Sequence, residues 1–124
     1  MQGRFIYIMM ALLCITAAAT AQQTRIYTDP QADFNQAKEY FQKEQYSLAY
    51  PLFKELRNKM RSADRSNNNI TYDDVQFYTI ACGLLQNETF AAEEAKGFIV
   101  LNYNPSLTQR LSFHLAEYHF RKND

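Results

Sequence analysis

Five stretches of the sequence carry apolar residues at the spacing of an amphipathic helix, and few residues would interrupt them. The 124 residues include only three glycines and three prolines. Aromatic residues make up 15% of the chain, which is more than a disordered protein carries. A turn-rich β-sandwich contains more glycine and proline than this. The sequence therefore predicts an all-α fold in one small domain.

The ends of these helices are marked by capping residues. Asp29 is expected to cap the first helix, with Pro30 at its first position. Ser47 is expected to cap the second helix, and Thr71 forms a capping box with Asp74 before the third. The fourth helix is expected over about residues 90–103. Two further expectations are a capping box of Ser106 with Gln109 before the fifth helix and a close helix approach at Gly97.

Residues 1–21 have the features of a secretory signal peptide. Arg4 precedes an apolar run over residues 5–19, and Ala19-Thr20-Ala21 is a small-residue cleavage site. A bilayer-spanning helix needs about 20 apolar residues, so the run is short for an anchor. The alternative is a membrane-tethered adaptor that keeps residues 5–19 as its N-terminal anchor. Export to the periplasm or to the outer membrane is the expected location.

The remaining chain is expected to contain a linker over residues 22–29 and a helical domain over residues 30–124. A loop insertion is expected at about residues 61–71, where no apolar stripe continues. A small residue recurs in the first, third and fifth helices, at Ala37, Ala81 and Ala116. These alanines are 44 and 35 residues apart. The second spacing is close to the 34-residue period of a tetratricopeptide repeat.

The second helix carries the A-x3-F element of that repeat at Ala49 and Phe53, preceded by an aromatic residue at Tyr46. The chain thus resembles the tetratricopeptide repeat family over residues 30–124. More closely, it resembles the N-terminal part of long secreted or envelope proteins of this family in Gram-negative bacteria. The resemblance implies an α-solenoid, a stack of antiparallel helix pairs with about two and a half repeats.

The function implied by the resemblance is a non-catalytic protein–protein interaction scaffold of the cell envelope, with no cofactor. Its partner is expected to be a protein or a peptide. The two are also expected to meet as part of a membrane-associated complex. Nucleic acid is not expected, because 13 basic residues balance 13 acidic ones. The concave groove of the family is lined by one face of each first helix. The matching residues here are Phe34, Lys38, Phe41, Tyr78, Leu85, Phe113, Glu117 and Phe120.

An alternative for these groove residues is that they only pack one first helix against the next, as aromatic stripes at helical spacing usually do. Other chemistry-bearing residues also have structural interpretations. His114, Glu117 and His119 do not share the three- or four-residue spacing of a helical metal site, so we expect packing histidines and no metal. Cys82 is expected to be a buried structural thiol. Asp73 and Asp74 are expected to cap the N-terminus of the third helix, where its dipole favours acidic side chains, rather than to take part in acid–base chemistry.

The fifth helix ends in a charged segment, residues 121–124, with no partner helix after it. Leu111, Leu115 and Tyr118 are then expected to lack part of their cover. From this pattern the sequence predicts that the chain is a fragment or an early-terminated version of a longer repeat array. If it is the whole protein, we expect it to dimerise or to bind a partner through the C-terminal helix.

The signal peptide predicts the start of the mature protein. Cleavage after Ala21 should leave Gln22 as the first residue, because the cleavage site requires small side chains at Ala19 and Ala21. Intact-mass measurement on protein from the native host tests this. A mass that includes residues 1–21 would favour the retained anchor instead.

Overall fold

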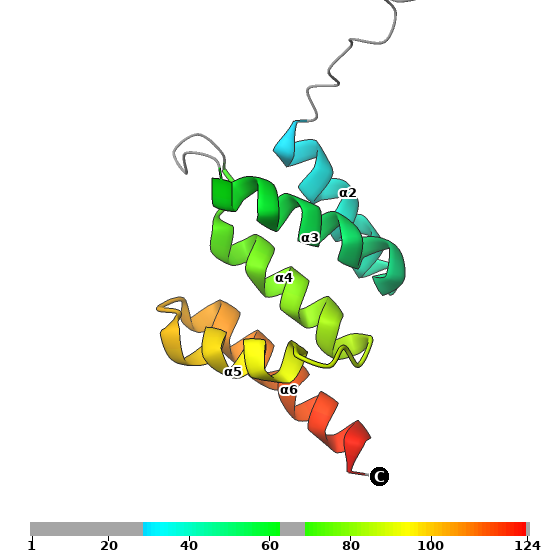
Figure 1. Ribbon diagram of the computed structural model, residues 1–124, viewed down its shortest axis with the longest axis vertical. Helices are drawn as coiled ribbons and strands as arrows, with labels where there is room; N and C mark the ends of the chain where they lie inside the picture. The colour runs from blue at the N-terminus through cyan, green and yellow to red at the C-terminus, as the bar shows by residue number, and fades with distance from the viewer. Residues whose placement is uncertain (1–28, 63–68, 124) are drawn as a thin grey trace, which may run out of the picture.

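The structure, a computed structural model, describes residues 29–62 and 69–123. The expected signal peptide, almost all of the expected linker and the centre of the expected insertion lie outside these residues. The described residues form five helices and no strand, which confirms the all-α prediction. The helices are α2 (Pro30–Gln42), α3 (Tyr46–Ser62), α4 (Tyr72–Leu85), α5 (Ala91–Leu101) and α6 (Pro105–Lys122). In Figure 1 the helices α2 and α3 lie at the top, α4 lies below them, and α5 and α6 lie at the bottom.

Helix α4 lies at the centre of this arrangement. It contacts α2 and α3 on one side and α5 and α6 on the other (Figure 1). Its residues from Phe77 to Leu84 are all buried, as is Val75. A helix that is apolar on every side has no face suited to water, so it requires neighbours all around it.

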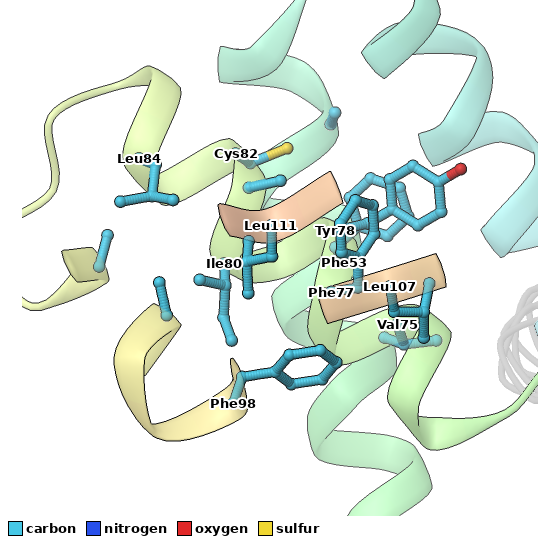
Figure 2. Packing of buried hydrophobic residues seen from close by; sticks show 14 of the residues in the cluster. Phe53, Val75, Phe77, Tyr78, Ile80, Cys82, Leu84, Phe98, Leu107 and Leu111 are labelled. Carbon is cyan, nitrogen blue, oxygen red and sulfur yellow. The ribbon is translucent and has the colours of Figure 1, made fainter. Parts of the chain in front are cut away.

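Aromatic rings join α4 to the first helix pair. The Tyr78 ring stacks on the Phe53 ring of α3, with the ring centres 5.1 Å apart. The Phe34 ring of α2 meets the edge of Tyr78 at 5.7 Å. Figure 2 shows Tyr78 and Phe53 side by side, with Leu107 and Leu111 from α6 also in the buried cluster. One continuous core therefore runs from α2 to α6.

The turns that follow α2 and α4 begin with the same backbone geometry. Glu44 and Asn87 both have a φ of 59°, the left-handed conformation common just after a helix end. In each turn the next amide donates to a carbonyl five residues earlier at 2.9 Å. The two turns are 43 residues apart, one fewer than Ala37 and Ala81. The alanine spacing is therefore one residue out of register with the repeated turn.

Two of the four predicted caps are confirmed. The Asp29 carboxylate accepts the Gln31 amide at 3.0 Å, and Thr71 forms its capping box with Asp74. The other two predictions are wrong. Helix α3 begins at Tyr46, so Ser47 lies inside it.

Helix α6 is capped by Asn104 rather than by Ser106. The Asn104 side chain accepts the amides of Ser106 and Leu107. Pro105 then occupies the first helical position, where its missing N–H costs nothing. The helix therefore starts before the predicted Ser106–Gln109 capping box.

The close helix approach occurs at Gly83, not at Gly97 as predicted. A methyl group added to Gly83 would lie 3.0 Å from the Cβ of Ala91, where α4 approaches α5. A methyl group added to Gly97 would have no neighbour within 4 Å. Gly97 therefore only weakens α5, whereas Gly83 allows the two helices to meet.

These surroundings predict opposite effects of the same substitution. Gly97→Ala should raise the free energy of unfolding by about 0.5–1 kcal/mol, because alanine favours a helix over glycine. Gly83→Ala should lower it by about 1 kcal/mol, because crowding against Ala91 outweighs that gain. Urea denaturation followed by circular dichroism measures both. An equal stabilisation by the two substitutions would contradict the close approach at Gly83.

Candidate functional site

Helices α2, α4 and α6 meet on one side of the molecule through contacts between their rings. Phe41 of α2 lies 5.1 Å from the Tyr78 ring of α4 and 6.4 Å from the His114 ring of α6. We call this side the α2–α4–α6 face. Its partly or fully exposed residues include Phe41, Arg110, His114 and Glu117. By helical spacing Lys38, three residues before Phe41, and Leu85, seven residues after Tyr78, lie on the same side of their helices.

Arg110 is held on this face by aromatic rings. Its guanidinium carbon lies 4.5 Å from the centre of the Phe77 ring and 5.8 Å from that of Tyr78. Both rings are buried in the core, so they provide a fixed surface for the cation. Within the described residues, Arg110 makes no hydrogen bond or ion pair. Its N–H donors therefore remain available to a ligand.

Arg121 connects the same side of α6 to the end of α4. Its Nη2 donates to the carbonyl oxygen of Leu84 at 2.9 Å. Its Nη1 lies 4.0 Å from a carboxylate oxygen of Glu117. A cation is favoured at this position because the C-terminal end of a helix carries partial negative charge. The guanidinium of Arg121 is thus occupied by contacts that hold α6 against α4, whereas that of Arg110 has no such polar contact.

His114 is enclosed between these groups. Its side chain is 20% exposed, and its Nδ1 has no hydrogen-bond partner, since the nearest oxygen of Glu117 is 3.7 Å away. Burial lowers the pKa of His114 below its ordinary 6.5, and the charges of Arg110 and Arg121 act in the same direction against Glu117. This environment therefore favours the neutral form of the imidazole.

The predicted groove residues fall into three groups. Phe34 and Tyr78 are each only 8% exposed and pack in the core, as in the packing alternative. Lys38, Phe41, Leu85 and Glu117 are partly buried and belong to the α2–α4–α6 face. The third group consists of Phe113 and Phe120.

Phe113 and Phe120 are 68% and 73% exposed. With the exposed Ala116 they lie on the side of α6 opposite the buried Leu107 and Leu111. We call these three residues the outer α6 face. The structure therefore does not place the predicted groove residues on one surface.

Two residues of the α2–α4–α6 face, Arg110 and His114, were not predicted as groove residues. The sequence predicted a packing role for His114 and assigned no role to Arg110. Their spacing of four, with Glu117 three residues further, already indicated one shared edge of α6. What the sequence did not show is that the buried Phe77 lies beneath Arg110.

The described residues contain no group of three histidine, cysteine, aspartate or glutamate side chains that would hold a metal ion.

Leu111 is fully buried, contrary to its predicted lack of cover, whereas Leu115 and Tyr118 are partly buried as predicted. Cys82 is fully buried, as predicted. Burial raises the pKa of its thiol to about 12, so it stays protonated and unreactive at neutral pH.

Two shallow cavities flank α5. The larger, of about 310 Å³, lies between the first turns of α4 and the side of α5 that carries Glu94, Gly97 and Leu101. The second, of about 240 Å³, lies between α3, α4 and α5. Neither is lined by histidine or cysteine.

Comparisons with protein-family models, with curated proteins and with solved structures find no match to this chain. Among the helices of the described residues, none combines the length and the apolar character needed to cross a membrane.

The lowered pKa of His114 predicts a pH-dependent stability. A histidine with a lower pKa in the folded chain takes up protons more readily when the chain unfolds. Its contribution to stability is complete above about pH 6.5 and is lost as the pH falls toward its folded pKa. The free energy of unfolding should therefore fall more steeply between about pH 7 and pH 5 in the unmodified protein than in His114→Gln.

Urea denaturation at several pH values measures this slope. His119→Gln is the matched control, because His119 is exposed on the same helix. We expect this control to keep the slope of the unmodified protein. If His114→Gln kept it as well, another group would be responsible.

Proposed function

We propose that the chain is a non-catalytic protein–protein interaction scaffold that binds a protein or peptide segment along the α2–α4–α6 face. The observation that carries the proposal is the Arg110 guanidinium, fixed over buried rings and without a polar partner in the described residues. Arginine and aromatic side chains are the types that contribute most at protein interfaces. Phe41 and His114 lie beside it on the same face.

The stacking of the helices supports a tetratricopeptide-like solenoid of about two and a half helix pairs. Each helix contacts the next one along the chain, and α4 also contacts α2 and α6. The same turn closes the first and second helix pairs. Solenoids of this kind present extended surfaces to their partners. In this stack α2, α4 and α6 are the first helices of successive repeats.

The chemistry of the face suits a particular kind of segment. Phe41 and Leu85 are partly exposed apolar side chains that would contact an apolar anchor of the partner. Arg110 would donate to a carbonyl or carboxylate oxygen of the same segment. Lys38 and Glu117 flank these groups with charges of both signs, which favours one orientation of the bound segment over the other.

The proposed location is the cell envelope, either periplasmic or associated with the outer membrane. The support is the basic, apolar and small-residue order of residues 1–21, which is typical of an exported protein.

Site-specific photo-cross-linking in the native host tests the proposal. A photoreactive phenylalanine analogue replaces Glu117 on the proposed face or Lys96 on α5, which is also exposed. We expect a discrete cross-linked protein from position 117 and little from position 96. In an Arg110→Ala background, the yield at 117 should fall about tenfold, because a central arginine contact contributes more than ~1 kcal/mol.

Stability measurements separate binding from folding in this experiment. Arg110→Ala should keep the helical content of the unmodified protein, whereas Tyr78→Ser should destabilise it by about 3 kcal/mol, because Tyr78 is buried. Equal cross-linking from positions 117 and 96 would contradict the proposal. A product of twice the chain's own mass would indicate self-association instead of a separate partner.

A further inference from the structure

The outer α6 face has the same residue pattern as two helices that already pack together. In each helix an aromatic residue is followed three positions later by alanine and four positions after that by another aromatic residue. The three sets are Phe34, Ala37 and Phe41 in α2; Tyr46, Ala49 and Phe53 in α3; and Phe113, Ala116 and Phe120 in α6. We call this the aromatic–alanine–aromatic pattern.

Helices α2 and α3 show how two such patterns fit together. The first aromatic residue of α2 meets the last of α3, with the Phe34 and Phe53 rings 5.9 Å apart. The last aromatic residue of α2 meets the first of α3, with the Phe41 and Tyr46 rings 5.4 Å apart. Ala37 and Ala49 are both fully buried. The pattern therefore packs against a reversed copy of itself.

On α6 the same pattern has no cover within the described residues. Phe113 is 68% exposed, whereas the corresponding Phe34 is 8% exposed. Phe120 is 73% exposed, and Ala116 is exposed between the two rings. The first and last rings of α6 can repeat both contacts of the α2–α3 pair if the second helix is another α6 running in the opposite direction.

We propose that two copies of this chain form a symmetric dimer through their outer α6 faces. A two-fold rotation makes the two α6 helices antiparallel, as α2 and α3 are. It places Phe113 of each copy on Phe120 of the other, and the two Ala116 residues where the helices cross. Such an interface uses the same patch on both copies, which is the usual arrangement in homodimers.

The expected affinity is modest. One helix face per copy gives an interface below the ~1,200 Å² of total buried area that is common for stable complexes. We therefore expect a dissociation constant of roughly 1–100 µM. The dimer leaves the α2–α4–α6 face uncovered, so this proposal and the proposed function can fail independently.

Sedimentation equilibrium of the full chain, at concentrations from about 1 to 300 µM, tests the dimer. The unmodified chain should show a monomer–dimer equilibrium, and Phe113→Lys and Phe120→Glu should each weaken it at least tenfold, as ~1.4 kcal/mol per lost ring pair implies. Phe90→Lys is the matched control, because Phe90 is 75% exposed at the start of α5. It should leave the equilibrium unchanged.

A mixing experiment tests the pairing itself. Phe113→Lys mixed with Phe120→Glu should form a mixed dimer more tightly than either variant pairs with itself. In the mixed dimer the introduced lysine of one copy meets the introduced glutamate of the other, and the remaining two phenylalanines meet each other. Both variants change exposed positions, so circular dichroism should show unchanged helical content.

Three results would overturn the proposal. One is a monomer at every concentration. Another is association that Phe113→Lys and Phe120→Glu leave intact, since contacts elsewhere would then hold the copies together. The third is a failure of the mixed pair to associate more tightly than its components, because the antiparallel contact of Phe113 with Phe120 requires that preference.

Discussion

The burial of α4 on all of its sides is the constraint on which the rest of the structure depends. From Phe77 to Leu84 every residue of this helix is buried, and α2, α3, α5 and α6 all contact it. Both helix pairs complete their cores against it, because α2 and α3 pack on the Tyr78 ring and α6 places Arg110 over the Phe77 ring. The α2–α4–α6 face therefore exists only when both halves of the stack are folded around α4.

The helices and several of their ends were predictable from the sequence because they depend on local interactions. Apolar spacing located all five helices, and Asp29 and Thr71 bind backbone amides two or three residues away. The failures were also local. Ser106 and Asn104 can both accept amide hydrogens, and Pro105 decided between them by occupying the first helical position. A capping pattern alone does not resolve such competition.

The candidate site was less predictable, because exposure depends on which helix covers a face. Phe34 and Phe113 occupy the same position in the same pattern, yet one is 8% exposed and the other 68%. Helical spacing shows that each shares a face with an alanine and a second ring, but it carries no information on the neighbouring helix. Likewise, Gly83 rather than Gly97 allows close approach because of where Ala91 lies in space.

The two faces proposed for α6 also bear on each other. Phe113 and His114 are consecutive and therefore point about 100° apart, one toward the outer α6 face and the other toward the α2–α4–α6 face. A dimer formed through the outer face would carry two open copies of the α2–α4–α6 face. For a partner with two binding segments and a linker long enough to span them, the second contact would become intramolecular and could raise the apparent affinity by about 10²–10⁴. A partner with a single segment would gain nothing. The dimer would thus favour partners with repeated segments, even though each individual contact remained weak.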